Sequence, residues 1–170
     1  MATPTQPLRD EHKELLPQIE RLGDVADLVG DTPVIALRQD VDDLYNFLQV
    51  NLLPHAQAEE QILYPVIANV MGAAEATATM SYDHEAIGEL IAELSALRQE
   101  LYGTYLPPSL AKSLRRVLYG LYAVVKIHFV KEEEIYLPLL DENLTAAEAK
   151  ELFAAMEQAA EDARRHPSFA

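Results

Sequence analysis

Two segments of the chain repeat one another, and they decide the fold. Residues 55–65 read His-Ala-Gln-Ala-Glu-Glu-Gln-Ile-Leu-Tyr-Pro, and residues 128–138 read His-Phe-Val-Lys-Glu-Glu-Glu-Ile-Tyr-Leu-Pro. In both segments the histidine, the Glu-Glu pair, the isoleucine and the proline fall at the same offsets. Residues four apart lie on one face of a helix, so each segment predicts a helix that presents an imidazole and a carboxylate in the same direction.

Helical periodicity extends outward from both segments, and no stretch shows the alternation that predicts a strand. Breakers such as Gly30, Gly72 and Gly103 divide the chain. They predict helices over about 7–28, 33–71, 74–101 and 109–140, with Pro54 bending the second, and a shorter fifth helix over about 145–165 that begins at a capping box. Long helices joined by short turns alternate in direction, so we expect an all-α, up-down-up-down four-helix bundle with a C-terminal appendage.

The first and third predicted helices echo each other more faintly, in Asp-Glu-His at 10–12 and Tyr-Asp-His at 82–84. His12 precedes His55 by 43 residues, and His84 precedes His128 by 44. We therefore expect two helical hairpins related by an approximate two-fold axis.

The composition limits the possible functions. With 170 residues, 49% of them hydrophobic, the chain is expected to form one domain over 1–170, with the bundle at about 7–140. The absence of cysteine excludes disulfide scaffolds, zinc fingers, cysteine-ligated iron–sulfur clusters and thiol catalysis. A net charge of −15 disfavours binding to nucleic acid or anionic membranes, and no segment predicts a membrane span or a signal peptide. We expect a cytoplasmic protein with no nucleic-acid or membrane partner.

Each predicted bundle helix carries one histidine, and two of them carry a glutamate one turn later. The resulting set is His12, His55, Glu59, His84, His128 and Glu132. An isolated buried carboxylate costs several kcal/mol, and a pair of metal ions held between these groups removes that cost. Imidazole with carboxylate suits iron, manganese or zinc, and six such residues leave two ions with vacant positions for water, oxide, dioxygen or peroxide.

Single features of this pattern have ordinary explanations. A lone histidine on an apolar helix face is more often a satisfied core or surface residue than a ligand. The conjunction of four helices, two identical pairs and an internal repeat favours the metal site. By their helical positions, Glu60, Glu133 and Glu134 are expected on solvated faces, with a supporting contact to a ligand residue as the alternative for one of them. Tyr45 and Tyr136 are expected about 80° from a ligand histidine, where core packing is favoured over a role in the site.

The repeated segments resemble the signature of the hemerythrin-like, or HHE cation-binding, family over about residues 8–140. The resemblance implies a non-haem di-iron centre in a four-helix bundle, with the six residues as ligands. It also implies Glu59 and Glu132 as bridging carboxylates. The implied cofactor is two iron ions, ahead of manganese or zinc, with an oxo, hydroxo or water bridge.

The pattern departs from that of the oxygen-carrying hemerythrins. They have a further histidine four residues after the third-helix one, where this chain has Gly88. Their last carboxylate is an aspartate five residues after its histidine, whereas Glu132 follows His128 by four. The chain resembles instead the four-His, two-Glu branch. That branch implies either a redox enzyme acting on peroxide, dioxygen or nitric oxide, or an oxygen, iron or nitric-oxide sensor or store without turnover. Gly88 itself has two explanations, close packing against a neighbouring helix or room for a small ligand.

Overall fold

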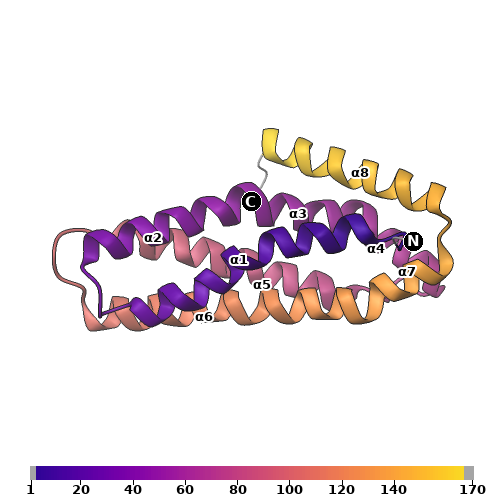
Figure 1. The fold of residues 1–170 in the computed structure, drawn as a ribbon. Helices are drawn as coiled ribbons and strands as arrows, with labels where there is room; N and C mark the ends of the chain where they lie inside the picture. Colours follow the sequence, from indigo (N-terminus) through magenta and orange to yellow (C-terminus); the bar gives the residue numbers. More distant parts are fainter. Residues whose placement is uncertain (1–2, 167–170) are drawn as a thin grey trace.

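The computed structural model describes residues 3–166 as four antiparallel helical columns, with a fifth helix beside them (Figure 1). The elements are α1 (Gln6–Leu28), α2 (Val34–Phe47), η1 (Leu48–Leu52), α3 (Leu53–Ala58), η2 (Glu59–Leu63), α4 (Tyr64–Met71), α5 (Ala78–Glu100), α6 (Pro108–Lys131), η3 (Glu132–Tyr136), α7 (Leu137–Asn143) and α8 (Ala146–Arg165), where η marks a π-helical turn. The described residues contain no strand, which confirms the predicted all-α bundle. Residues 1–2 and 167–170, the ends of the expected 1–170 domain, lie outside the described part.

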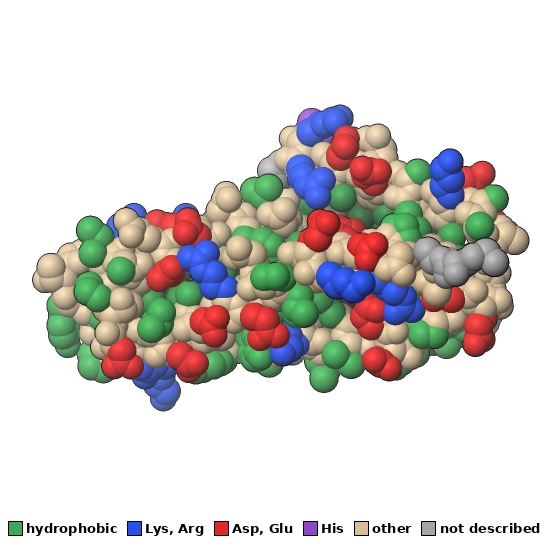
Figure 2. Space-filling view, in the orientation of Figure 1, with side chains coloured by type: hydrophobic (Ala, Val, Ile, Leu, Met, Phe, Trp, Pro, Cys, Tyr) green, Lys and Arg blue, Asp and Glu red, His purple; other side chains and the backbone are tan. Residues whose placement is uncertain are grey.

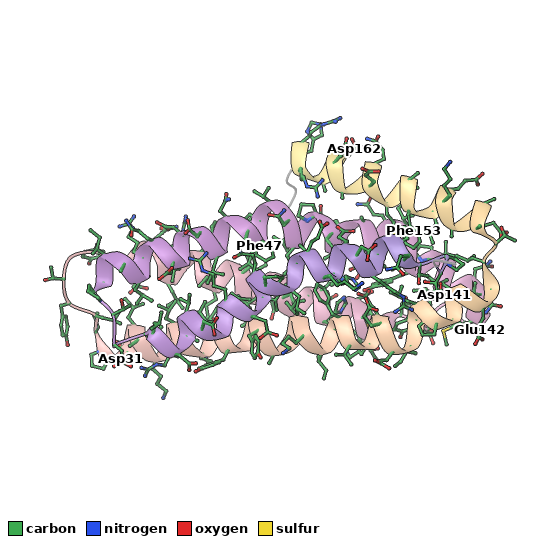
Figure 3. The ribbon with its side chains drawn as sticks, in the orientation of Figure 1. Asp31, Phe47, Asp141, Glu142, Phe153 and Asp162 are labelled. Atoms are coloured by element: carbon green, nitrogen blue, oxygen red, sulfur yellow. The ribbon has the colours of Figure 1, made fainter. Side chains whose placement is uncertain are left out.

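The columns are α1, α2 to α4, α5, and α6 to α7 (Figure 1). α6 packs against both α1 and α5, and α2 packs against the same two helices. The N-terminal end of the first column is hydrogen-bonded to α7 in the last column, at the end of the bundle where Asp141 lies (Figure 3). There the backbone N–H and the hydroxyl of buried Thr5 both donate to Asp141 Oδ1, each at 2.9 Å.

Three π turns interrupt the second and fourth columns, where the sequence predicted α-helix with only a bend at Pro54. In each case a proline is the second residue of the α-helix that follows the π turn: Pro54 after η1, Pro65 after η2 and Pro138 after η3. Proline has no N–H to bond the carbonyl four residues earlier, so the regular ladder is already broken at these points. The glutamates Glu59 and Glu132 open the second and third π turns.

Apolar side chains form two clusters along the bundle. One lies toward the turns near Gly30 and Gly103 and includes Leu22, Leu44 and Leu118. The other lies toward the opposite end and includes Leu8, Leu63 and Leu137 together with residues of α8. Among the described residues, no helix combines the length and apolarity that crossing a membrane requires.

Helix α8 covers one side of the bundle. It begins at the predicted capping box, in which Thr145 Oγ1 accepts from the N–H of Glu148, and the Glu148 carboxylate accepts from the N–H of Thr145 at 2.8 Å. Its buried residues Ala149, Leu152, Met156 and Ala160 share one face, and the helix packs on α3 and η2.

Gly88 lies within α5, and a Cβ added there would meet no atom within 4 Å. The close-packing explanation of this glycine is therefore wrong. Gly88→Ala is expected to raise the free energy of unfolding by about 1 kcal/mol, the difference in helix propensity. Denaturant unfolding at matched metal content measures it.

Gly72 provides the contrasting control, because it ends α4 at φ 65°. Gly72→Ala is expected to lower stability by roughly 1–2 kcal/mol, the cost of a left-handed conformation. A Gly88→Ala variant less stable than the parent would contradict the open environment described for this position.

Candidate metal centre

The six residues singled out in the sequence meet inside the bundle, between the two apolar clusters. His12 comes from α1, His84 from α5, and the His-x-x-x-Glu pairs from α3–η2 and α6–η3. Glu59 and Glu132 are fully buried, and the side chain of His84 is the most exposed of the six at 9%. The four columns thus converge on one polar site in an otherwise apolar interior.

The first donor group consists of His12 Nε2, His55 Nε2, Glu59 Oε1 and Glu132 Oε2. His55 Nε2 lies 2.9 Å from Glu59 Oε1, and His12 Nε2 lies 3.4 Å from Glu132 Oε2. One ligand atom from each of these four residues lies within 4.8 Å of the others. Four donor atoms this close can bind one cation.

The second donor group consists of His84 Nε2, His128 Nε2, Glu59 Oε2 and Glu132 Oε1. The two imidazole nitrogens are 3.0 Å apart. Glu59 Oε2 lies 3.3 Å from His84 Nε2, and Glu132 Oε1 lies 3.5 Å from His128 Nε2. Each glutamate therefore turns one oxygen to each histidine pair, as a carboxylate that bridges two cations does.

Several of these atoms have no hydrogen-bond partner. Within the described residues, the buried atoms without one are His12 Nε2, His55 Nε2, both oxygens of Glu59 and Glu132 Oε2. Each unsatisfied buried polar atom costs about 1–3 kcal/mol. All five belong to the two donor groups, so bound cations would satisfy them together. The residues fit a dinuclear metal centre.

Protons compete for the same imidazoles in the metal-free chain. Burial lowers the pKa of His12, but the nearby carboxylates of Glu132 and Glu59 outweigh it and raise that pKa to about 9. Burial likewise lowers the pKa of His84, and the Glu59 and Glu60 carboxylates raise it to about 9. Cations bind neutral imidazole, so metal loading must displace these protons.

Two outer carboxylates, Glu60 and Glu133, were predicted to lie on solvated faces, with a supporting contact as the alternative for one of them. Both are half-buried and both contact a histidine of the site. Glu60 Oε1 lies 2.8 Å from His84 Nδ1, and Glu133 Oε1 lies 2.8 Å from His12 Nδ1. Each follows Glu59 or Glu132 by one residue and reaches a histidine on another column. Of the three glutamates predicted on solvated faces, Glu60, Glu133 and Glu134, Glu134 is the one that is exposed.

Two further outer carboxylates complete the pattern. Glu11 Oε1 lies 3.1 Å from His55 Nδ1, and Asp83 Oδ2 lies 3.2 Å from His128 Nδ1 and also pairs with Lys131. Each precedes a histidine of the site by one residue, so the approximate two-fold extends to all four outer contacts. A carboxylate at Nδ1 holds the proton there and leaves the Nε2 lone pair facing the centre.

The hydroxyl of Tyr64 also reaches the second donor group. It lies 3.1 Å from Glu132 Oε1, 3.3 Å from His128 Nε2 and 3.5 Å from His84 Nε2. Burial, followed by the charges of Glu59 and Glu132, raises the pKa of this phenol, so in the metal-free chain it donates to Glu132 Oε1. Its oxygen is a fifth donor beside the four atoms of the second group.

Sequence reasoning missed Tyr64 because of the π turn. At 100° per residue, nine α-helical positions after His55 lie roughly 180° away from it. The intervening η2 uses about one more residue per turn than an α-helix, so the chain rotates less and Tyr64 faces the site. Pro65, at the same offset as Pro138, was the available signal. Of the two tyrosines considered in the sequence, Tyr136 donates to the Ala76 carbonyl at 3.0 Å and Tyr45 packs beneath Arg98.

The two donor groups differ in their surroundings. Phe129 stacks on the His12 ring at 4.4 Å, and Ala56 holds the equivalent place in the other repeat. The repeat position that corresponds to Tyr64 is Leu137. The first group therefore has an aromatic wall and no phenol, whereas the second group has the phenol.

Comparisons with known proteins agree with this geometry. No curated protein and no solved structure matches the chain. The family model described as Hemerythrin HHE cation binding domain matches residues 3–139, which span all four columns and stop before α8. The chain therefore belongs to the hemerythrin HHE cation-binding domain family.

Proposed function

We propose that this protein holds two iron ions, one in each donor group, and reduces a small oxidant, with peroxide as the first choice. The observation that supports this is the sharing of Glu59 and Glu132 between the two histidine pairs. A site for one ion would not need two carboxylates that each direct one oxygen to each histidine pair. Zinc has no redox chemistry, so a reaction with an oxidant favours iron or manganese, and iron is placed first because the resemblance to the hemerythrin-like family implies it.

The number of protein donors differs between the two groups. The first offers two imidazoles and two carboxylate oxygens within 4.8 Å of one another. In the second, donor atoms of His84, His128 and Glu59 meet that spacing, and Glu132 Oε1 and the Tyr64 hydroxyl lie beside them. An octahedral ion takes six donors, so the first group leaves more room for an exogenous ligand. When bound, the iron pair supplies the electrons that the oxidant accepts.

The chain's own residues orient the histidine rings and exclude water from the centre. The outer carboxylates fix the four rings, and Phe129 shields His12 and His55 from water with an apolar surface. In the metal-free chain Tyr64 holds a proton next to Glu132 Oε1, and this proton would leave when the phenol binds a cation. These features position a small oxidant and limit competing water.

Metal analysis and turnover test the proposal together. Protein purified without added zinc or nickel is expected to contain about two irons per chain and, with excess ascorbate added as the electron donor, to consume peroxide over many cycles. One metal or none per chain would rule out the dinuclear centre. Two irons without repeated turnover would favour the sensor or store, which changes state once.

The outer carboxylates should tune metal affinity. Glu60→Gln and Glu133→Gln are each expected to weaken metal binding by roughly 10–100-fold, because each leaves one ring less well held. Glu59→Ala should cause a larger loss, since it removes a donor from both groups. Competition with a chelator of known affinity measures all three.

Glu134→Gln is the matched control, because Glu134 is exposed and adjacent in sequence. It should leave metal affinity unchanged. Equal losses in Glu134→Gln and Glu133→Gln would mean that net charge, and not the contact with His12, sets the affinity.

Tyr64 should give the iron-loaded protein a spectroscopic signature. Its oxygen lies among three atoms of the second group, so we expect a phenolate-to-ferric charge-transfer band in the visible spectrum. Tyr64→Phe should abolish this band while keeping both irons. Tyr136→Phe, which removes a hydroxyl bonded to the backbone, is the control and should leave the band in place. Retention of the band in Tyr64→Phe would show that the phenol is not a ligand.

A further inference from the structure

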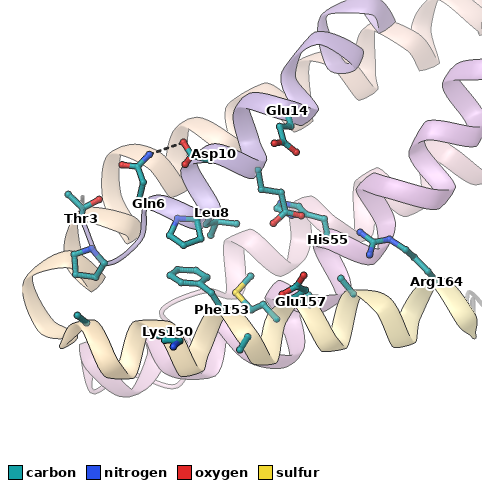
Figure 4. Close-up of a pocket in the computed structure, with 18 residues that line it drawn as sticks. Thr3, Gln6, Leu8, Asp10, Glu14, His55, Lys150, Phe153, Glu157 and Arg164 are labelled. Atoms are coloured by element: carbon teal, nitrogen blue, oxygen red, sulfur yellow. Dashed lines mark hydrogen bonds and ion pairs between the residues drawn. The ribbon is translucent and has the colours of Figure 1, made fainter. Parts of the chain in front are cut away.

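A cavity of about 910 Å³ lies between α1 and α8, outside the centre described above (Figure 4). The space-filling view shows the corresponding hollow beneath α8 (Figure 2). The cavity is open to solvent, and its volume is large enough for a small organic molecule. Because α8 forms one wall and lies beyond the family match at residues 3–139, the cavity is an addition to the family domain.

The walls of this cavity are largely apolar. Leu8 on α1 faces Phe153 on α8 (Figure 4), and Pro7, Ala58 and Met156 also line the cavity. Leu8, Ala58 and Met156 are buried parts of the apolar cluster around α8. A flat or elongated apolar body fits between such walls.

The charges around the cavity are mostly negative. Four carboxylates line it, from Asp10, Glu11, Glu14 and Glu157, against the two cationic side chains of Lys150 and Arg164. Arg164 is anchored at one end, where its Nε donates to the Val50 carbonyl at 3.2 Å. Across residues 3–166, Glu14 and Glu157 have no ion-pair partner, so their charges are available to a ligand.

We propose that this cavity binds an organic cation, an amine or quaternary ammonium attached to an aromatic or alkyl body. The ammonium would be attracted by the exposed carboxylates of Glu14 on α1 and Glu157 on α8, and the apolar body would lie between Leu8 and Phe153. An aromatic wall also favours ammonium groups through its π face. Phosphate-bearing and carboxylate-bearing molecules are repelled by the same carboxylates.

The cavity also touches the metal centre. His55 lines it, and Glu11, which lines it as well, contacts His55 Nδ1 at 3.1 Å. A bound cation would therefore lie next to a contact that orients one of the site imidazoles. The binding site itself stands on the cavity and its charges, and does not depend on what the metal centre reacts with.

Calorimetric titration of the metal-containing protein tests the proposal with three probes of one shape. We expect 2-phenylethylamine, protonated at neutral pH, to bind at least about fivefold more tightly than 2-phenylethanol, and 3-phenylpropionate to bind least. The preference should shrink at high salt, because the carboxylates are partly solvated. Equal binding of the amine and the carboxylate would overturn the proposal.

Variants with matched controls locate the site. The double variant Glu14→Gln, Glu157→Gln should weaken amine binding about fivefold, whereas Glu151→Gln, roughly 240° round α8 from Glu157, should not.

Ala154→Trp should fill the exposed edge of the cavity and abolish binding, whereas Ala155→Trp, which does not line it, should not. Thermal midpoints of all variants separate loss of the site from loss of the fold. Unchanged binding in Ala154→Trp, or equal losses in Glu151→Gln and the double variant, would refute this location.

Discussion

The burial of two carboxylates in the middle of an apolar bundle is the constraint on which the rest of the structure depends. Glu59 and Glu132 are both 0% exposed, and an uncompensated buried charge of this kind costs several kcal/mol. The chain surrounds the pair with four imidazoles, and each imidazole with a carboxylate on its far side. The bundle thus surrounds a central pair of carboxylates with a layer of imidazoles and an outer layer of carboxylates, and the two apolar clusters lie on either side along the bundle.

Much of this arrangement could be predicted from the sequence. The four-residue spacing of His55 and Glu59, repeated at 128 and 132, is a direct consequence of helical geometry, so the bundle and the convergence of the six residues followed from it. Their role as ligands stays a prediction. The partners of the outer carboxylates could not be predicted, because each contacts a histidine on another column and a projection of one helix does not show what lies across from it. The sequence offered only the alternative that one of Glu60, Glu133 and Glu134 supports a ligand.

The π turns explain why Tyr64 was not predicted as part of the site, and they also shape the centre. A periodic reading assumes one angle per residue along a whole helix, and η2 changes that angle just before Tyr64. The repeat carries a π turn in both halves, but the residues that the turns bring forward differ, a phenol in one half and Leu137 in the other. Helix α8 adds to this difference because it packs on α3 and η2 of one hairpin. An architecture with near two-fold symmetry thus produces two unequal halves.

The contact between Thr5 and Asp141 has a topological consequence. It brings the start of the first column to the end of the last, so the four columns form a closed ring. The geometry of the centre then does not depend on which column comes first in the sequence. A chain that began at α5 and continued from α7 into α1 through a short linker would present the same six side chains from the same directions. What the bundle needs is cyclic adjacency of its columns, and the position of the natural ends is free to vary around it.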